Sequence, residues 1–281
     1  MGGARGGRSR SRRRPRGPDR RRRDDLGGGQ VEGRQAVREL LLAGLRPVRE
    51  VLIERDLRPA AILDDIRELA AGRRVPLREV GRGRLASEAV TEAPQGVLAR
   101  AGPLPIADLD ATLAGDGSQV PFLLAVDGVT DPRNLGALLR SAECAGATGA
   151  VLPRRRSAHV TPAVAKAAAG AIEHLPIALT PGLPAALARA ADAGVWVVGL
   201  DADADRPIGD LPVSTSPVMV VVGAEGAGLS RLVRQRCDLV CAIPLHGNLG
   251  SLNVAAAGTV ALYEVATRRS PPGSRSTPAQ G

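Results

Sequence analysis

The sequence has almost no aromatic residues. Among 281 positions there is one Phe, one Trp and one Tyr, namely Phe122, Trp196 and Tyr263. RNA-recognition sheets of the RRM type stack bases on several exposed aromatic rings, so this scarcity excludes a surface of that kind. Any binding of nucleic acid would therefore depend on arginine side chains and backbone groups.

Long apolar runs are also absent. The most apolar segments, such as 122–126 and 218–222, have the length of a β-strand. They are far shorter than the roughly 20 residues that a membrane-spanning helix needs. An apolar content of 44% is nevertheless enough for a hydrophobic core. We therefore expect a soluble globular protein of one large domain or two smaller ones, with no membrane span.

Cysteine is scarce and unpaired in the sequence. Cys144, Cys237 and Cys241 are odd in number and lack the spacing of zinc ligands, and the three histidines are scattered. We expect buried or idle thiols, no metal site and a reducing, cytoplasmic location. A carboxylate pair, a Ser-His-Asp order and a phosphate-binding P-loop are also missing, which argues against glycosidases, hydrolases and NTPases.

Lysine occurs once, as Lys166, so arginine carries nearly all of the positive charge. The formal net charge is +9, and the first 25 residues hold eleven Arg against three Asp, a net +8. A mixture of Arg, Gly and Pro buries little apolar surface, so we predict that residues 1–29 form a disordered tail that binds phosphate groups. The tail has no apolar stretch, which argues against a secretory signal, while an organellar transit peptide stays open as an alternative.

Residues 30–101 have the pattern of a small α/β domain. Apolar spacing predicts helices at 31–44 and 60–71 and strands at 48–53, 75–80 and 96–101. Residues 102–119 contain several Pro and Gly, which is typical of a linker. The Pro- and Ser-rich residues 269–281 are predicted to be a second disordered tail.

Strands and helices alternate through residues 120–268. The predicted strands are 121–126, 149–152, 175–179, 195–200, 217–222 and 239–243, and the predicted helices are 134–145, 161–170, 183–193, 229–236 and 252–267. This alternation predicts a parallel sheet with helices on both faces. Ligands of such sheets bind beyond the carboxyl ends of the strands.

Three loops that follow strands carry the polar residues of interest. In the first, Asn134 is placed as a helix N-cap, and capping explains it as well as catalysis does. For Arg140, six residues later, an ordinary surface position is the alternative to a functional role. In the second, Gly223, Glu225 and two further glycines form a tight turn. A carboxylate there would repel a pyrophosphate, so the turn suits a cationic or neutral ligand better than a dinucleotide, although a charge that favours the following helix dipole is an alternative.

The third loop runs from Ile243 to the start of the last helix. Ser251 is placed to cap that helix, and capping would suffice to explain it. Asn253 lies between Leu252 and Val254, where an amide in a helix's first turn should face another polar group. The loop therefore predicts at least one polar side chain directed into a site.

Taken in order, the segments 134–140, 223–229 and 243–254 resemble the three motifs of SpoU (TrmH-like) RNA 2'-O-ribose methyltransferases of the SPOUT superfamily. The likeness spans residues 121–267. Residues 31–37, 93–97 and 127–134 are also similar to the large-subunit rRNA guanosine enzymes of that family. The resemblance implies an α/β fold with two parts: a small N-terminal L30e-like RNA substrate-binding domain and a parallel-sheet domain with a trefoil knot.

The resemblance also implies roles for particular residues. S-adenosylmethionine would be held by backbone around Gly223, Ile243 and Leu252. The polar active-site positions correspond to Asn134, Arg140, Glu225, Ser251 and Asn253. One departure is Ala255, where many relatives have Ser. The family's implied partners are ribosomal RNA and a second copy of the chain, paired through the knotted domain.

The implied reaction is attack of a ribose 2'-oxygen on the sulfonium methyl group. A ribose hydroxyl is too weakly acidic to react unaided at neutral pH, so the site needs a base or a group that stabilises the alkoxide. Arg140 is the family's proposed group. Because a guanidinium stays protonated in proteins, we favour an electrostatic clamp over deprotonation by Arg140.

Several alternatives remain at this point. Within the class, the acceptor is a guanosine of large-subunit (23S) rRNA, a transfer RNA ribose, or an rRNA adenosine as in resistance enzymes. Outside it, the chain is a non-catalytic RNA-binding protein or a dinucleotide enzyme using residues 217–236. The order of glycines and the carboxylate of Glu225 disfavour the dinucleotide enzyme.

Overall fold

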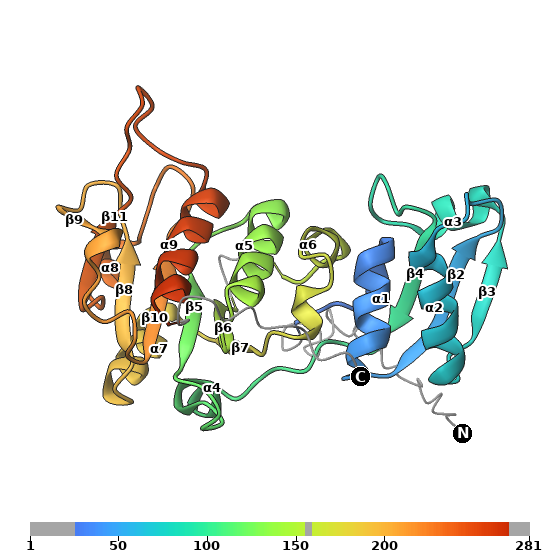
Figure 1. The fold of residues 1–281 in the computed structure, drawn as a ribbon, viewed down its shortest axis with the longest axis horizontal. Coiled ribbons are helices and arrows are strands. Elements are labelled where there is room, and N and C mark those ends of the chain that lie inside the picture. Colours follow the sequence, from blue (N-terminus) through green and yellow to red (C-terminus); the bar gives the residue numbers. More distant parts are fainter. Residues whose placement is uncertain (1–25, 155–158, 270–281) are drawn as a thin grey trace, which may run out of the picture.

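The computed structural model describes residues 26–154 and 159–269, which fold into two α/β domains joined side by side (Figure 1). Most of the predicted N-terminal tail and residues 270–281 lie outside this range. Residues 26–29 are packed rather than free, since Leu26 is buried and Gly28 N donates a hydrogen bond to Val160 O at 2.8 Å. The chain is thus anchored to the second domain before the first domain begins.

The N-terminal domain has a four-stranded mixed sheet in the order β1-β4-β2-β3, in which only β2 and β3 are parallel. Its elements are β1 (Gln30–Glu32), α1 (Arg34–Ala43), β2 (Val48–Glu54), α2 (Ala61–Gly72), β3 (Leu77–Val80), α3 (Arg82–Glu88) and β4 (Val97–Ala101). Apolar residues of α1 and α2 pack together with the sheet in one core.

Two elements of this domain differ from the sequence prediction. The first helix begins at Arg34 instead of residue 31. Gly33 has φ 103°, which is not a helical conformation, so the helix cannot start before it and the preceding residues form β1. The short helix α3 was not predicted. It buries a single side chain, Leu85, and so has too few apolar positions to show a helical period.

The segment that joins the domains contains a helix of its own, α4 (Leu109–Ala114). The Asp108 carboxylate caps this helix by accepting a hydrogen bond from Ala111 N at 3.0 Å. Ala107 N donates to Ile177 O at 2.9 Å, which ties the segment to the second sheet. The predicted linker 102–119 is therefore partly folded onto the C-terminal domain.

The C-terminal domain has a seven-stranded sheet in the order β7-β6-β5-β10-β8-β11-β9, and all of its pairs are parallel. Its strands are β5 (Phe122–Val126), β6 (Gly149–Pro153), β7 (Ile177–Thr180), β8 (Trp196–Leu200), β9 (Arg206–Pro207), β10 (Val218–Val222) and β11 (Leu239–Ala242). Its helices are α5 (Pro132–Cys144), α6 (Pro162–Ala167), η2 (Ala171–Glu173), α7 (Leu183–Asp192), η3 (Ile208–Asp210), α8 (Arg231–Arg234) and α9 (Val254–Arg269). The predicted parallel α/β architecture is confirmed.

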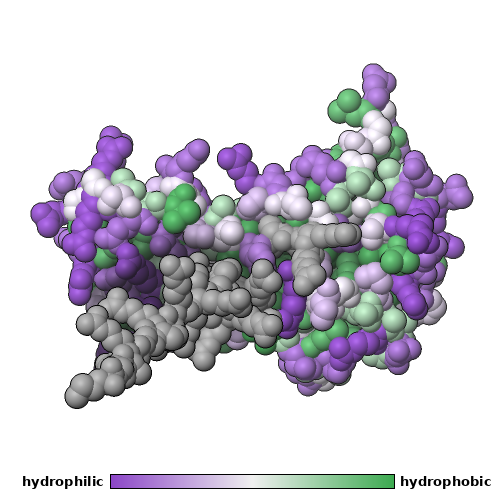
Figure 2. Space-filling view, turned by 180° about the vertical axis from the view of Figure 1, so that it is seen from behind, coloured by the Kyte–Doolittle hydropathy of each residue, from purple (hydrophilic) through white to green (hydrophobic). Residues whose placement is uncertain are grey.

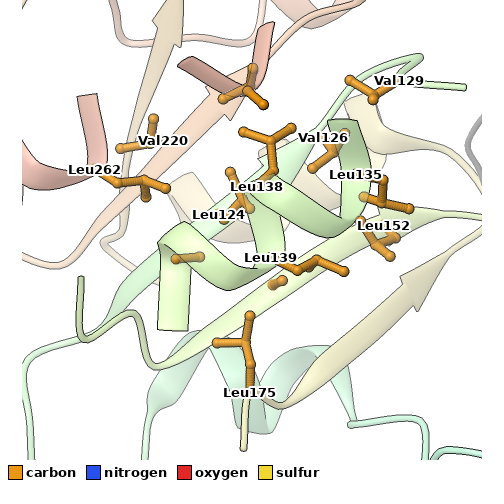
Figure 3. Close-up of a cluster of buried hydrophobic side chains, with 14 of the residues drawn as sticks. Leu124, Val126, Val129, Leu135, Leu138, Leu139, Leu152, Leu175, Val220 and Leu262 are labelled. Atoms are coloured by element: carbon orange, nitrogen blue, oxygen red, sulfur yellow. The ribbon is translucent and has the colours of Figure 1, made fainter. Parts of the chain in front are cut away.

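Each face of this sheet has its own hydrophobic core. Side chains of α5, α6 and α9 pack on one face, where Leu124, Leu138 and Leu262 meet (Figure 3). Side chains of α4, α7 and α8 pack on the other. A Cβ at Gly258 would overlap Leu138, so α9 lies unusually close to α5 at this point.

The strand order brings distant loops together. Strand β10 inserts between β5 and β8, and β11 follows on the far side of β8. Because parallel strands share one carboxyl edge, the loops after β5, β10 and β11 all lie at the same edge of the sheet. Viewed from behind, the described surface is largely hydrophilic with small separated apolar patches (Figure 2). Among the described residues, no helix is both long and apolar enough to cross a membrane.

A buried ion pair joins the two domains. Arg46 Nε and Nη2 donate to the Glu173 carboxylate at 3.0 and 2.5 Å, and their side chains are only 2% and 1% exposed. Arg46 Nη1 donates to the carbonyl oxygens of Gly28 and Gly102, each at 2.5 Å. One guanidinium thus holds the first domain, the N-terminal anchor and the connecting segment to η2.

Candidate functional site

The segments that follow β8, β10 and β11 surround a cavity of about 520 Å³ at the carboxyl edge of the sheet. Its walls come from the end of β8, the glycine-rich loop 223–228 and the start of α9. The lining residues are Leu200 to Asp203, Val222 to Gly228, Cys241, Ile243, Leu245, Ser251 to Val254 and Ala257. This size lies within the range of roughly 300–1,000 Å³ that small-molecule sites occupy.

A chain of hydrogen bonds joins the loops after β5, β10 and β11. Asn253 Nδ2 donates to Asn134 Oδ1 at 3.1 Å, and Asn134 Nδ2 donates to Glu225 Oε2 at 3.1 Å. Asn134 is buried at the start of α5, between the other two residues. Three of the five polar residues expected from the sequence therefore lie in direct contact.

The caps of the two helices differ from those expected. Helix α5 begins at Pro132, and Asp131, not Asn134, caps it by accepting a hydrogen bond from Arg133 N at 2.7 Å. Helix α9 is capped by Asn253, not Ser251, because Asn253 Oδ1 accepts from Ala255 N at 2.9 Å and from Ala256 N at 3.4 Å. Asn134 is thus free of a capping role, whereas Asn253 both caps α9 and donates to Asn134.

The conformation of the glycine-rich loop is fixed by its own backbone contacts. Ala224 N donates to Gly228 O and Gly228 N to Ala224 O, both at 2.9 Å, so the loop closes on itself. A Cβ at Gly223 would overlap the backbone of Gly228, which excludes any side chain there. Glu225, exposed at the tip, lies six residues before α8, too far to act on that helix's dipole. Its carboxylate instead accepts the Asn134 hydrogen bond.

The cavity walls combine apolar and acidic groups. Ile243, Leu252 and Leu200 supply apolar surface beside the exposed backbone of the glycine-rich loop. The carboxylates are Glu225, Asp203 and Asp201, and the last also pairs with Arg234. Such a site suits a ligand with an apolar part and a positive charge.

Ser251 and Arg140 are placed differently from the hydrogen-bonded residues. Ser251 is exposed and lines the cavity without joining the chain of hydrogen bonds. Arg140 lies six residues beyond Asn134, which corresponds to about 9 Å along α5. It is exposed, does not line the cavity, and pairs with no carboxylate of the described residues. The structure therefore separates Arg140 from the pocket of its own chain.

Asp127 is a further polar residue at this edge that the sequence reasoning did not single out. Its carboxylate accepts a hydrogen bond from Ser230 N at 2.7 Å, which fixes the loop after β5 to the segment before α8. The available signal was its place directly after the buried strand β5. Asp127 holds two of the loops in position without lining the cavity.

The three cysteines have different surroundings. Cys144 is exposed, Cys241 is buried, and Cys237 Sγ donates a weak hydrogen bond to Val233 O at 3.3 Å. Burial and the nearby Asp238 raise the pKa of the Cys237 thiol to about 12, so it stays protonated at neutral pH. Among the described residues, no three His, Cys, Asp or Glu side chains are grouped as metal ligands would be.

Comparison with known proteins identifies both domains. Residues 121–263 match a family model described as the SpoU rRNA Methylase family, and residues 30–107 match one described as RNA 2'-O ribose methyltransferase substrate binding. The chain is 36% identical over 245 residues to YacO of Bacillus subtilis (strain 168), which is named for the TrmH family of tRNA/rRNA methyltransferases. That alignment covers 86% of this chain and 97% of YacO.

Solved structures agree with these matches. The fold is similar to the SpoU methyltransferase AviRb from Streptomyces viridochromogenes in complex with AdoMet, with a TM-score of 0.72, 29% identity, and coverage of 90% of this chain and 94% of that one. It is also similar to an RNA methyltransferase of the TrmH family from Porphyromonas gingivalis, with a TM-score of 0.67, 27% identity, and coverage of 85% and 89%.

Proposed function

Given that the chain belongs to the SpoU rRNA methylase family, we propose that it methylates the ribose 2'-oxygen of a guanosine in large-subunit (23S) ribosomal RNA. Membership makes the chain an RNA methyltransferase that uses S-adenosylmethionine. The observation that carries the proposal is the Asn253–Asn134–Glu225 chain of hydrogen bonds beside the cavity. It holds polar groups of three loops next to a pocket of cofactor size.

The cavity residues fit this cofactor. Backbone at Gly223 lies open because no side chain is tolerated there, and Ile243 and Leu252 provide apolar walls for an adenine ring. Glu225 and Asp203 provide negative charge toward a sulfonium. When bound, the cofactor supplies an electrophilic methyl group. We assign Gly223, Ile243 and Leu252 to its binding.

Two requirements of the reaction fall to the protein's own side chains. The ribose hydroxyl must be oriented, which we assign to Asn134, fixed between Glu225 and Asn253, with Ser251 completing the polar wall. Negative charge on the 2'-oxygen must also be stabilised. We assign that to Arg140, whose planar, permanently charged guanidinium can donate to an alkoxide and a phosphate together.

The position of Arg140 supports a site that needs a second copy of the chain. Beside α5, helix α9 exposes an apolar stripe of Ala256, Val260 and Tyr263, the last two 39% and 44% exposed. A second copy packed on α5 and α9 would cover this stripe and bring another chain next to Arg140. We therefore propose a homodimer through this domain.

Mixing two inactive variants tests that arrangement. Arg140→Ala removes the proposed clamp, and Gly223→Val blocks the cofactor pocket. If each site combines the pocket of one chain with Arg140 of the other, a heterodimer of the two variants contains one intact site. If each site uses its own Arg140, the heterodimer contains none. Restored activity on mixing supports a shared site. If mixing restores nothing while sedimentation shows heterodimers, each site uses its own Arg140.

The choice of acceptor rests on the first domain and on the tail. The substrate-binding match covers residues 30–107, and the net +8 of the first 25 residues suits a polyanion. The likeness of 127–134 to guanosine enzymes supports guanosine over a transfer RNA ribose or an rRNA adenosine. We propose a cytoplasmic reaction on ribosomal RNA, and a trefoil knot, which the insertion of β10 between β5 and β8 supports.

Ribose-methylation mapping tests the substrate directly. Large-subunit rRNA from a strain lacking the gene should lose one 2'-O-methyl guanosine, and the intact gene should restore it. Loss of a 2'-O-methyl group from a transfer RNA instead would show that the acceptor is a transfer RNA ribose. An unchanged set of ribose methyl groups in all RNA, with RNA binding intact, would favour a non-catalytic RNA-binding protein.

A further inference from the structure

Helix α6 lies between the catalytic helix α5 and the first domain (Figure 1). On the α5 side, a Cβ at Gly136 would lie 2.5 Å from Ala167 Cβ and 2.7 Å from Val164 O, so the two helices are in backbone contact. On the other side, Lys166 Cγ is 3.8 Å from the corresponding position at Gly33. Lys166 thus occupies the boundary between the domains, next in sequence to a residue that contacts α5.

Lys166 is an isolated cation in this position. It is half-buried, and its ammonium forms no hydrogen bond or ion pair with any described residue. It is also the sole lysine among 38 basic residues. An ammonium without a partner keeps its N–H donors available to an anion.

Two arginines of the neighbouring helices α1 and α5 also lack a carboxylate partner among the described residues. Arg34 follows Gly33 at the start of α1; its Nε donates to Gln95 O at 3.1 Å, and no described carboxylate contacts it. Arg133 is exposed in the first turn of α5, immediately before Asn134. Of the acidic residues near this boundary, Glu173 pairs with Arg46 and Glu39 with Arg38. Glu32, next to Gly33, is buried and accepts hydrogen bonds from Thr91 and from the backbone of Val90. We call Lys166, Arg34 and Arg133 the boundary cluster.

We propose that the boundary cluster binds backbone phosphates of the RNA strand where it passes from the first domain to the ribose site. Lys166 contacts one phosphate at the boundary between the domains, and Arg34 and Arg133 contact its neighbours. Arg133 and Arg140 are seven residues apart, so they lie on nearly the same face of α5. The cationic path therefore continues from the boundary to the proposed clamp. This inference rests on RNA being the substrate.

The single lysine permits a direct test on the unmodified full chain. Acetic anhydride at low dose modifies ε-amines, and Lys166 is the only one, so peptide mass spectrometry reports its rate of acetylation. Deproteinised large-subunit rRNA at saturation should slow that rate at least several-fold. Inorganic phosphate and S-adenosylmethionine should not, which separates an RNA strand from a free phosphate. An unchanged rate with RNA bound, or equal protection by inorganic phosphate, overturns the proposal.

Variants give a second, independent measurement. Lys166→Met keeps the length of the side chain and removes the charge, so RNA affinity should fall and the slope of log affinity against log salt should flatten by about 0.7. Lys166→Arg should keep most of the slope. Arg236→Met is the matched control, since Arg236 is exposed and unpaired on the α8 side of the sheet.

The outcomes separate this inference from the proposed function. If the wild-type protein methylates RNA while Lys166→Met keeps wild-type RNA affinity and salt slope, the proposed phosphate binding by the boundary cluster is wrong and the proposed function stands. If no RNA is methylated but Lys166 is protected by RNA, the proposed function fails and the binding surface stands. The acetylation experiment uses only wild-type protein, so it decides the matter even if a variant does not fold.

Discussion

Two arginines in two regions of the molecule have opposite surroundings. At the domain boundary, Arg46 is 2% exposed and donates to a carboxylate and two carbonyl oxygens of the protein itself. On α5, Arg140 is exposed and pairs with no described carboxylate. The first guanidinium is saturated and holds the structure together. The second has no counterion among the described residues and is accessible to a ligand.

The same contrast applies to the carboxylates that accompany them. Glu173 is fully occupied by Arg46, whereas Glu225 receives a single amide hydrogen bond and stays exposed beside the cavity. Buried, saturated groups should therefore affect stability when changed, and exposed, unsaturated groups should affect turnover. The following changes test that division, beginning with the largest expected effect.

Glu173→Gln should cause the largest loss of stability. The change leaves the Arg46 charge buried without its counterion, which costs about 3–5 kcal/mol. Chemical denaturation should show a lower free energy of unfolding, or separate unfolding of the two domains. A loss below about 1 kcal/mol would mean that the boundary opens to water and that the pair does not hold the domains.

Arg140→Ala should leave the free energy of unfolding unchanged and lower turnover. Loss of one preorganised donor to a developing oxyanion costs roughly 10²–10³-fold in rate. The measurement is single-turnover methyl transfer to rRNA, with cofactor affinity by calorimetry as the control. We expect unchanged cofactor affinity, because Arg140 does not line the cavity. Arg140→Lys keeps the positive charge but removes the planar guanidinium. Substantial turnover in that variant would contradict the clamp we propose.

Asn253→Asp separates the two roles of one side chain. An aspartate caps a helix as well as an asparagine, so α9 and the free energy of unfolding should be preserved. The donor to Asn134 Oδ1 is lost, and we expect turnover to fall about tenfold, the effect of roughly 1–2 kcal/mol for one unmade hydrogen bond. Asn253→Ala should lose both stability and turnover. Equal turnover in Asn253→Asp and wild type would show that Asn253 serves only as a cap.

Glu39→Gln should have the smallest effect, although it lies at the same domain boundary as Glu173. Its carboxylate accepts from Arg38 at 2.9 Å and contacts His174 at 2.9 Å, and these partners are partly exposed. Solvent-exposed pairs contribute at most about 1 kcal/mol. Thermal unfolding of the two glutamate variants side by side would reveal whether burial sets the difference. Equal destabilisation by both would contradict it.

Much of the fold was predictable because it depends on local patterns. The β-branched strands and the alternation of strands and helices gave the parallel sheet, and three spaced motifs gave the family. The insertion of β10 between β5 and β8 is a long-range pairing that periodicity does not encode. The sequence analysis placed the caps of α5 and α9 at the wrong residues, whereas the structure has them at Asp131 and Asn253. Asp, Ser and Asn are all good caps, and several of them occur within a few residues of each other.

The site was predictable in composition but only partly in geometry. The sequence indicated the contact of Asn253 with a polar group, and the structure identifies that group as Asn134. The pairing of Arg46 with Glu173 had no local signal, because the residues are 127 positions apart and each is one isolated charge among many. Nor does the sequence distinguish the exposed Arg140 from the buried Arg46. Only the folded contacts do.

In vitro methyl transfer tests the central claim most directly. Purified wild-type protein, isotope-labelled S-adenosylmethionine and large-subunit rRNA from the deletion strain would be combined, and the labelled nucleotide mapped by mass spectrometry. We predict one ribose 2'-O-methyl group on a single guanosine, with none formed by Arg140→Ala in the same time. Label on a base instead of a ribose, or cofactor and RNA binding without any transfer, would contradict the account.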